Sequence, residues 1–297
     1  MQPLQKLLAA GQPIILDGAM GTMLMNAGLE AGNAPEKWNV LHPEIIQKIH
    51  RDYIHAGAQI ILTNSFGGNR YRLALHRLAD RADEFNKSAA ANARIEADKA
   101  NRLVIVAGSM GPTGQLLKPL GTITAEEAQK AFADQAAALA EGGVDMFWIE
   151  TMSDLEEVKA AVRGIRSVST LPISATMSFD TNGHTMMGVS PGKAMEVLGK
   201  LDLFSIGANC GTGPEKLQEA LKLMRKVNPN ALLVAKANAG IPQLIDDQEI
   251  YNGTPQVMAE YAIQAREIGA ALIGGCCGNT PEHIKAIAKA LSSAATE

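Results

Sequence analysis

A regular alternation of short apolar runs and longer amphipathic stretches extends along the 297-residue chain and constrains its fold more than any other feature. Short, continuous runs rich in Ile, Val, Leu or Phe are typical of strands that are buried on both faces of a parallel sheet. Eight such runs occur, at residues 13–16, 59–63, 103–107, 145–149, 172–177, 203–208, 232–235 and 271–273. The pattern therefore predicts a parallel sheet whose strands alternate with helices.

Amphipathic stretches that follow these runs predict the helices. In residues 43–56, Ile46, Ile49 and Tyr53 fall on one stripe at helical spacing. The stretch 124–141 opens with Thr-Ala-Glu-Glu, a capping-box pattern. Further helices are predicted at residues 153–168, 214–227, 254–268 and 281–291. Eight strand–helix units predict an α/β fold, a single (β/α)8 TIM barrel over residues 1–297; a doubly wound open sheet is the alternative.

Composition and charge argue against several classes of protein. Hydrophobic residues make up 46% and charged residues 20% of the chain, which argues against a disordered protein. The net charge of −4 and the lack of a Lys/Arg cluster argue against nucleic-acid and membrane-surface partners. No apolar run approaches the roughly 20 residues of a membrane helix, and residues 1–6 lack a signal-peptide core. We therefore expect a cytoplasmic protein.

Polar residues stand at the ends of the predicted strands, and all three cysteines are among them. These residues are Asp17, Asn64, Ser109, Glu150, Asn209, Cys210, Asn238, Cys276 and Cys277. The carboxyl ends of barrel strands meet on one face, where barrel enzymes have their active sites. The long irregular stretches 18–41, 108–123 and 240–253 also follow strands, so we expect them on the same face.

The three cysteines, Cys210, Cys276 and Cys277, predict a zinc site with one open position. An odd number of cysteines in a chain of this length does not suggest a disulfide framework. Zinc prefers tetrahedral sulfur and nitrogen ligands, and a catalytic site keeps one position exchangeable. Two alternatives stay open at this point. The cysteines are small core residues, or Cys276 and Cys277 form a vicinal redox disulfide.

Three thiolates around Zn2+ suit a soft anionic ligand better than the activation of water. A substrate thiol in the fourth position would lose its proton and stay nucleophilic, because metal binding lowers the pKa of a thiol. The chemistry implied is alkylation of a bound thiol. Asp17 and Glu150 lie at the same rim and are candidates to hold a substrate ammonium by charge-assisted hydrogen bonds. Helix capping or a structural ion pair is the alternative for each of them.

Six short motifs make the chain resemble the homocysteine S-methyltransferase family, from about residue 11 to residue 290. The motifs are Asp17-Gly-Ala-Met-Gly-Thr22, Thr63-Asn-Ser-Phe-Gly67, Gly108-Ser-Met-Gly-Pro112, Ile149-Glu-Thr151, Gly207-Ala-Asn-Cys-Gly211 and Gly274-Gly-Cys-Cys-Gly278. The resemblance implies a zinc-dependent enzyme that transfers a methyl group to the thiol of L-homocysteine and forms methionine.

The resemblance also implies roles for single residues. Cys210, Cys276 and Cys277 correspond to the zinc ligands of the family, and Asp17 and Glu150 correspond to the catalytic residues that contact the amino group of homocysteine.

Three further positions are expected at the same site. Asn238 matches a position near the metal. The backbone around Ser65 and Phe66 is expected to bind the carboxylate of homocysteine.

The methyl donor is expected to be a small onium compound, whose positive charge aromatic faces tolerate. Trp38, Tyr71 and Trp148 are the candidates for the donor pocket, and Trp38 aligns with an aromatic residue of the betaine enzymes. The animal betaine enzyme has tyrosines where Gly67 and Thr151 stand here, so its aromatic cage is not reproduced residue by residue. The overall likeness is to bacterial stand-alone proteins of the betaine–homocysteine methyltransferase type, which makes glycine betaine the first expectation.

Other interpretations remain open for the donor and for the role of the chain. The donor is S-methylmethionine or another sulfonium, or a separate corrinoid protein delivers the methyl group. A third interpretation is that the barrel is not an enzyme and uses its thiolates to store or sense zinc. A homo-oligomer is compatible with all of them.

Overall fold

Eight parallel strands form one sheet in the computed structural model, which describes residues 3–245 and 248–293. The strands are β1 (Ile14–Ile15), β2 (Ile60–Leu62), β3 (Ile105–Met110), β4 (Met146–Met152), β5 (Ile173–Met177), β6 (Ser205–Cys210), β7 (Leu233–Ala237) and β10 (Ala270–Gly275). Each lies within or next to one of the eight apolar runs, so the predicted parallel sheet is confirmed. The order of the strands is β1-β10-β7-β6-β5-β4-β3-β2.

The sheet closes on itself, which makes it a barrel and excludes the open doubly wound alternative. β1 pairs with β10 on one side, and Leu16, just after β1, bridges in parallel to Ile60 of β2 on the other. The backbone N–H of Gln59 donates to the carbonyl of Ile15 at 2.7 Å, and the N–H of Asp17 donates to the carbonyl of Ile60 at 3.1 Å. The fold is a single (β/α)8 domain.

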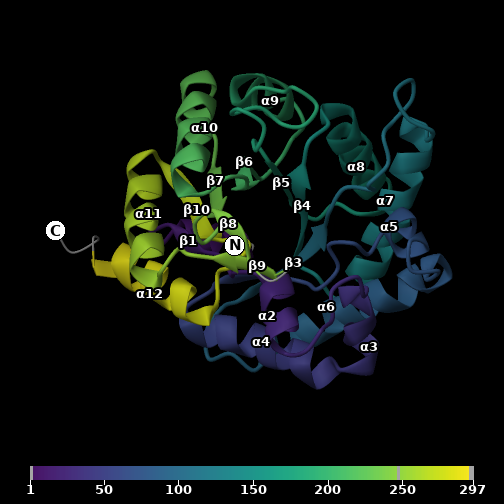
Figure 1. Ribbon diagram of the computed structural model, residues 1–297, viewed down its shortest axis with the longest axis horizontal. Coiled ribbons are helices and arrows are strands. Elements are labelled where there is room, and N and C mark those ends of the chain that lie inside the picture. Colours follow the sequence, from purple (N-terminus) through teal and green to yellow (C-terminus); the bar gives the residue numbers. More distant parts are fainter. Residues whose placement is uncertain (1–2, 246–247, 294–297) are drawn as a thin grey trace.

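Helices surround the sheet, as Figure 1 shows in a view into the barrel. The α-helices are α1 (Pro3–Leu8), α2 (Met20–Asn26), α3 (Trp38–Leu41), α4 (Pro43–Ala56), α5 (Arg70–Ala74), α6 (Ala82–Asp98), α7 (Ala125–Glu141), α8 (Leu155–Val168), α9 (Pro191–Leu198), α10 (Pro214–Val227), α11 (Pro255–Glu267) and α12 (Pro281–Ser293). Two short 3-10 helices are η1 (Pro35–Lys37) and η2 (Ala79–Arg81). None of the helices in the described residues is long and apolar enough to cross a membrane.

Local sequence signals explain where several helices begin. Thr124 and Glu127 form the predicted capping box of α7, in which each side chain bonds the backbone N–H of the other residue. α8 begins two residues later than the predicted stretch, because Asp154 is its N-cap and accepts from the N–H of Glu156. α4 and α10 begin with Pro43 and Pro214, where a proline loses no hydrogen bond.

The apolar residues form two cores, one inside the barrel and one between the sheet and the helices. Ile60, Ile105, Trp148 and Leu272 belong to the inner core, together with small and branched residues of β1, β3 and β7. The larger outer core lies between the strands and the surrounding helices. Alternate strand residues enter each core because successive side chains of a strand point to opposite faces.

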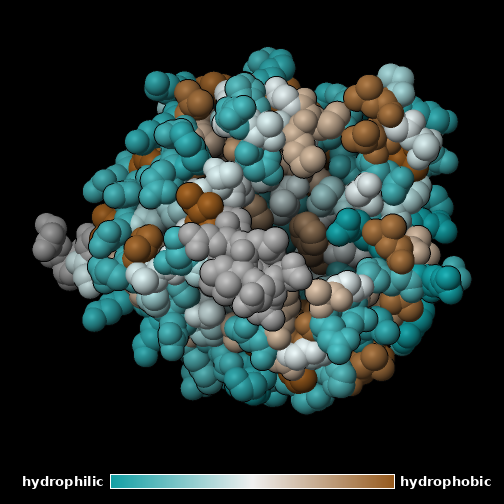
Figure 2. Space-filling view, in the orientation of Figure 1, coloured by the Kyte–Doolittle hydropathy of each residue, from teal (hydrophilic) through white to brown (hydrophobic). Residues whose placement is uncertain are grey.

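The long connections that follow β1 and β7 contain additional helices and strands at the carboxyl ends of the barrel strands. The stretch 18–41, predicted to be irregular, contains α2, η1 and α3. The stretch 240–253 contains an antiparallel hairpin of β8 (Pro242–Ile245) and β9 (Gln248–Tyr251). Figure 2 shows that the face seen in Figure 1 is hollowed near its centre.

Candidate metal centre and substrate cavity

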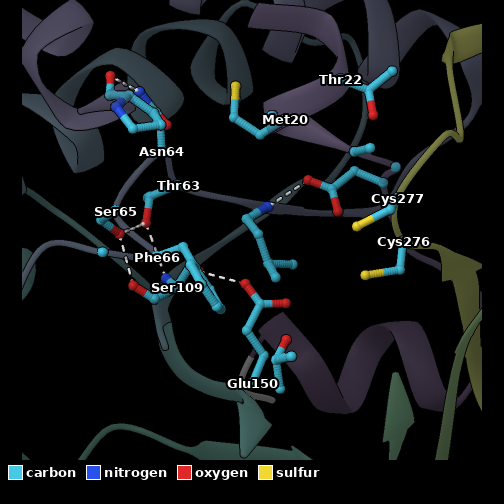
Figure 3. Close-up of a pocket in the computed structure, with 18 of the residues that line it drawn as sticks. Met20, Thr22, Thr63, Asn64, Ser65, Phe66, Ser109, Glu150, Cys276 and Cys277 are labelled. Atoms are coloured by element: carbon cyan, nitrogen blue, oxygen red, sulfur yellow. Dashed lines mark hydrogen bonds between the residues drawn. The ribbon is translucent and has the colours of Figure 1, made fainter. Parts of the chain in front are cut away.

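The three cysteines meet at the carboxyl ends of β6 and β10, although Cys210 and Cys276 are far apart in the sequence. Their Sγ atoms all lie within 4.8 Å of one another, and no disulfide joins them. The Sγ of Cys210 is 2.7 Å from that of Cys276 and 4.0 Å from that of Cys277. Figure 3 shows the sulfur atoms of Cys276 and Cys277 pointing into a cavity that Glu150 and Phe66 also border.

The backbone on the β6 side of the cluster has an unusual conformation. Cys210 has a φ of 57° and Thr151, at the end of β4, has a φ of 60°. Non-glycine residues rarely adopt this left-handed region, and such strain gathers at functional sites. Asn209 links the two residues, because its Oδ1 accepts from the N–H of Thr151 at 2.9 Å and its Nδ2 donates to Thr151 Oγ1 at 2.7 Å.

Asn209 also contacts the sulfur atoms directly. Its Nδ2 lies 3.4 Å from Cys210 Sγ and 3.6 Å from Cys276 Sγ, both within reach of an N–H···S hydrogen bond. An N–H donor beside a thiolate stabilises the negative charge.

Two buried asparagines fix the loop that carries Cys276 and Cys277. Asn238 donates to the carbonyl of Gly211 at 2.9 Å and accepts from the N–H of Cys277 at 3.1 Å, so it ties together the two loops that hold the sulfurs. Asn279 donates to the carbonyls of Ala237 and Cys276 at 2.9 and 3.1 Å. Asn238 thus lies beside the cluster but does not line the cavity.

The three cysteine thiols can be ionised together only beside a cation. Hydrogen bonding with Cys210 favours the thiolate of Cys276, but the nearby Cys277 sulfur and burial outweigh it and raise the pKa of Cys276 to about 12. The sulfurs of Cys276 and Cys277 and burial likewise raise the pKa of Cys210. Three thiolates therefore coexist at neutral pH only if a metal ion neutralises them. Tetrahedral zinc with bonds of about 2.3 Å spaces its sulfur ligands about 3.8 Å apart. The 4.0 Å between the sulfurs of Cys210 and Cys277 is close to this spacing. The sulfurs of Cys210 and Cys276, 2.7 Å apart, would have to separate by about an ångström.

A buried ion pair forms part of the cavity wall. Lys236 of β7 reaches Asp17, with 3.2 Å between Nζ and Oδ1, and both side chains are almost fully buried. Asp17 Oδ2 also accepts from the N–H of Leu62 at 2.7 Å. Burial raises the pKa of Asp17, and Lys236 opposes that shift. Burial disfavours the charge of Lys236, but the carboxylates of Asp17 and Glu150 outweigh it and raise the pKa of Lys236.

Glu150 ends a chain of hydrogen bonds that crosses three strands (Figure 3). Ser109 Oγ donates to Glu150 Oε1 at 2.5 Å, and the N–H of Ser109 donates to Thr63 Oγ1 at 2.9 Å. Ser65 Oγ lies 2.6 Å from Thr63 Oγ1 and donates to the carbonyl of Ser109 at 2.8 Å. Burial raises the pKa of Glu150 to about 7, with Cys276 adding to the shift and Lys236 opposing it.

One cavity of about 440 Å3 joins these groups. Its inner half is bordered by the three cysteines, Asp17, Glu150, Ser109 and Lys236. Its outer half is bordered by Met20, Met25, Ser65, Phe66, Glu36, Arg72 and His76. Of the predicted substrate-binding residues, Asp17, Ser65, Phe66 and Glu150 therefore share a cavity with the metal cluster.

The three aromatic candidates for the donor pocket lie elsewhere. Trp148 is fully buried in the inner core of the barrel, and its ring centroid lies 5.9 Å from Lys236 Nζ. It lies on the same strand face as Glu150 but two residues earlier, and therefore deeper in the barrel. Trp38 packs against the outer core and meets His42 edge-on at 4.7 Å. Tyr71 also packs against the outer core. None of the three is among the residues that line the cavity.

The sequence reasoning missed several residues of the site. Lys236 had a signal, because it directly follows the apolar run 232–235, and a lysine is rarely buried in a strand unless it is paired. Asn209 was named only as a polar residue at a strand end, and its contacts with the two sulfurs were not predicted. Glu36 and Arg72 had none, because they reach the cavity from short helices in the connections after β1 and β2, whose path the sequence pattern does not specify.

The barrel and its cluster define a class: a (β/α)8 protein with a thiolate metal centre at the carboxyl face. Comparison with known proteins gives the family. The homocysteine S-methyltransferase family profile matches residues 14–291, and the chain belongs to this family. It is 35% identical over 294 residues to methionine synthase of Mycobacterium tuberculosis (strain ATCC 25618 / H37Rv) and 34% identical over 300 residues to that of Mycobacterium leprae (strain TN).

Coverage differs between the sequence relatives and the similar structures. The alignments cover 93% and 95% of this chain but only 24% of each methionine synthase, so the chain spans about a quarter of the length of these curated relatives. The metallated form of the homocysteine methyltransferase MmuM from Escherichia coli has a TM-score of 0.82 and 25% identity, over 97% of this chain and 99% of that one. Its apo form has a TM-score of 0.76.

The thiol cluster is accordingly the zinc site of a chain that belongs to the homocysteine S-methyltransferase family. Cys210, Cys276 and Cys277 are the one group of three or more potential metal ligands that comes together in the described residues. The alternative of unconnected core cysteines is wrong, because the three sulfurs converge on a cavity.

Proposed function

We propose that the protein transfers a methyl group from a small onium donor to the sulfur of L-homocysteine and releases methionine. The observation that carries this proposal is the convergence of three thiols and the Glu150 carboxylate on one cavity. Homocysteine has a thiol at one end, which can bind the metal, and an ammonium group at the other end, which can bind a carboxylate. Storage or sensing of zinc requires no such carboxylate.

The residues of the inner half would orient homocysteine. Glu150 offers its carboxylate to the ammonium, with one oxygen held by Ser109. Both oxygens of Asp17 already accept bonds, from Leu62 and Lys236, so Asp17 adds negative charge and holds Lys236 in place. The backbone N–H of Phe66 has no acceptor within the described parts of the chain and suits the carboxylate of homocysteine.

Zinc, when bound, keeps the substrate sulfur in its reactive thiolate form near neutral pH. The chain holds the reactants in line and excludes water from the reacting atoms. A sulfur–carbon bond forms as the bond between the methyl carbon and the donor heteroatom breaks. The bonding electron pair stays with the donor, which leaves as a neutral amine or thioether.

Glycine betaine is the first donor to test, and S-methylmethionine or another sulfonium is the alternative. The likeness to one quarter of the methionine synthases keeps a third source open, a separate corrinoid protein. Methionine formation from homocysteine over a panel of these donors separates them. Turnover that requires an added corrinoid protein would favour the last.

The test of the metal assignment is Cys210→Ala, because the remaining pair of cysteines cannot complete the site. We expect this variant to lose both bound zinc and methionine formation, measured as the zinc-to-protein ratio and the rate. A Cys210→Ala protein that keeps full zinc and full rate would refute the proposal.

A further inference from the structure

The outer half of the cavity carries opposite charges that the proposed mechanism does not use. Glu36 belongs to η1 and Arg72 to α5, and both line the cavity together with His76. We propose that Glu36 and Arg72 form a subsite for a zwitterionic methyl donor, with the donor's cationic group at Glu36 and its carboxylate at Arg72. This assignment rests on the proposed function, since it names the donor end of the same cavity.

Glu36 is a buried carboxylate that a backbone hydrogen bond holds in place. It is only 4% exposed, and its Oε1 accepts from the N–H of Gly67 at 2.7 Å. A Cβ at position 67 would lie 2.9 Å from that oxygen, so the glycine makes room for the carboxylate at this place. Within the described ranges of the chain, no ion pair involves Glu36. A buried carboxylate gains most from a ligand that brings a positive charge.

Arg72 is the complementary group. Asn69 caps α5, with its Oδ1 accepting from the N–H groups of Tyr71 and Arg72 at 3.1 Å each, which fixes the start of the helix. The Arg72 side chain crosses Gly114, where a Cβ would lie 3.1 Å from its Cδ and 3.2 Å from its Nη1. Its guanidinium forms no ion pair with a residue in the described segments. A free guanidinium at a cavity wall is well suited to bind a carboxylate in a bidentate manner.

The chemistry of the wall matches a molecule that has both charges. Glu36, Arg72 and His76 line the same cavity. Burial raises the pKa of Glu36, and the positive charges of His76 and Arg72 oppose that shift. Phe66, which is 37% exposed, adds an aromatic ring that tolerates an onium group. Glycine betaine and S-methylmethionine both carry a cation and a carboxylate, whereas choline and trimethylsulfonium have no carboxylate.

The test measures binding with probes that cannot react. N,N-dimethylglycine and L-methionine are what the two zwitterionic donors become after losing a methyl group, and dimethylaminoethanol is the counterpart without a carboxylate. Each is titrated by calorimetry into the zinc-loaded protein, with and without saturating homocysteine. We expect at least one zwitterion to bind at least about 10-fold more tightly than dimethylaminoethanol, and the one that binds identifies which donor chemistry the subsite takes.

Substitutions then assign the charges. Arg72→Met is expected to weaken the bound zwitterion by about 10- to 100-fold and to leave dimethylaminoethanol unchanged. Arg70→Met is the matched control, because Arg70 is exposed on the same helix and does not line the cavity. Glu36→Gln retains an acceptor for Gly67 and is expected to weaken both probes, whereas the exposed Glu30→Gln changes neither. Circular dichroism and zinc content check that each variant is folded.

Two results would overturn the subsite. One is wild-type affinity for the zwitterion in Arg72→Met, and the other is a wild-type protein that binds neither zwitterion. If homocysteine still binds at zinc in that case, the donor assignment fails and the proposed acceptor stands. If homocysteine does not bind but a zwitterion binds in an Arg72-dependent manner, the proposed function fails and the subsite stands.

Discussion

Three buried charges, Asp17, Lys236 and Glu150, set the electrostatics of the inner cavity. Lys236 satisfies Asp17 directly and lies close enough to Glu150 to oppose the rise in its pKa. Lys236 offsets the charge of one of the two carboxylates. The three groups together therefore retain a net negative charge, which suits a substrate ammonium. The same arrangement makes the barrel interior sensitive to the loss of the lysine.

Lys236→Met is expected to lower the free energy of unfolding by about 3–5 kcal/mol, because it leaves Asp17 buried without a cation. Chemical denaturation of the zinc-loaded protein measures the change. The double variant Asp17→Asn/Lys236→Met should recover part of the loss, since it removes the orphaned charge. A Lys236→Met protein as stable as the wild type would show that the pair contributes nothing.

Glu150→Gln is expected to raise the KM for homocysteine by about 10- to 100-fold, because the charge-assisted bond to the ammonium is lost. The amide oxygen can still accept from Ser109, so the local structure is preserved. Zinc content should stay at the wild-type ratio. The exposed Glu156→Gln is the control, and equal KM values for the two variants would remove Glu150 from homocysteine binding.

Among the elements, α4 contains a buried titratable group with no evident role in the site. His50 is fully buried, and neither of its ring nitrogens has a hydrogen-bond partner among the residues described. Burial lowers the pKa of His50 from 6.5 to about 4. The folded protein therefore holds this imidazole neutral at a pH where the unfolded chain would protonate it.

His50 makes the stability of the protein depend on pH. Above pH 6.5 the ring is neutral in both states, and between pH 6.5 and about 4 only the unfolded chain binds the proton, so stability falls on acidification. The loss from this residue approaches about 3 kcal/mol near pH 4. His50→Leu should flatten that part of the denaturation profile, and His55→Leu, exposed on the same helix, should not. Identical slopes for wild type and His50→Leu would contradict the account.

Helices and strands with a strong local sequence pattern could be predicted, and those without one could not. α4, α7 and α10 could be placed from an apolar stripe, a capping box and an initial proline. The short helices within residues 18–41 could not, because helices of three to seven residues are too short to show a periodic pattern. The hairpin of β8 and β9 was missed for a similar reason, since its strands are only four residues each.

For the whole molecule, the eight apolar runs favoured a barrel but left a doubly wound open sheet as the alternative. The pairing of β1 with β10 and the bridge from Leu16 to Ile60 close the barrel and bring the strand ends together. The metal cluster and Glu150 were predictable because a strand end has a fixed place in that fold. Trp148 shows the limit of this reasoning. It shares the strand face of Glu150, as predicted, but it lies deeper along β4, in the inner core and not at the cavity. The outer cavity was not predictable, because Glu36 and Arg72 depend on loop paths that no periodicity encodes.

The most direct test of the central claim is X-ray absorption at the zinc edge, with and without homocysteine. The account predicts three sulfur neighbours at about 2.3 Å in the zinc-loaded protein and a fourth when homocysteine is added. Fewer than three sulfurs, or a sulfur count that homocysteine leaves unchanged, would contradict a metal centre that activates the substrate thiol.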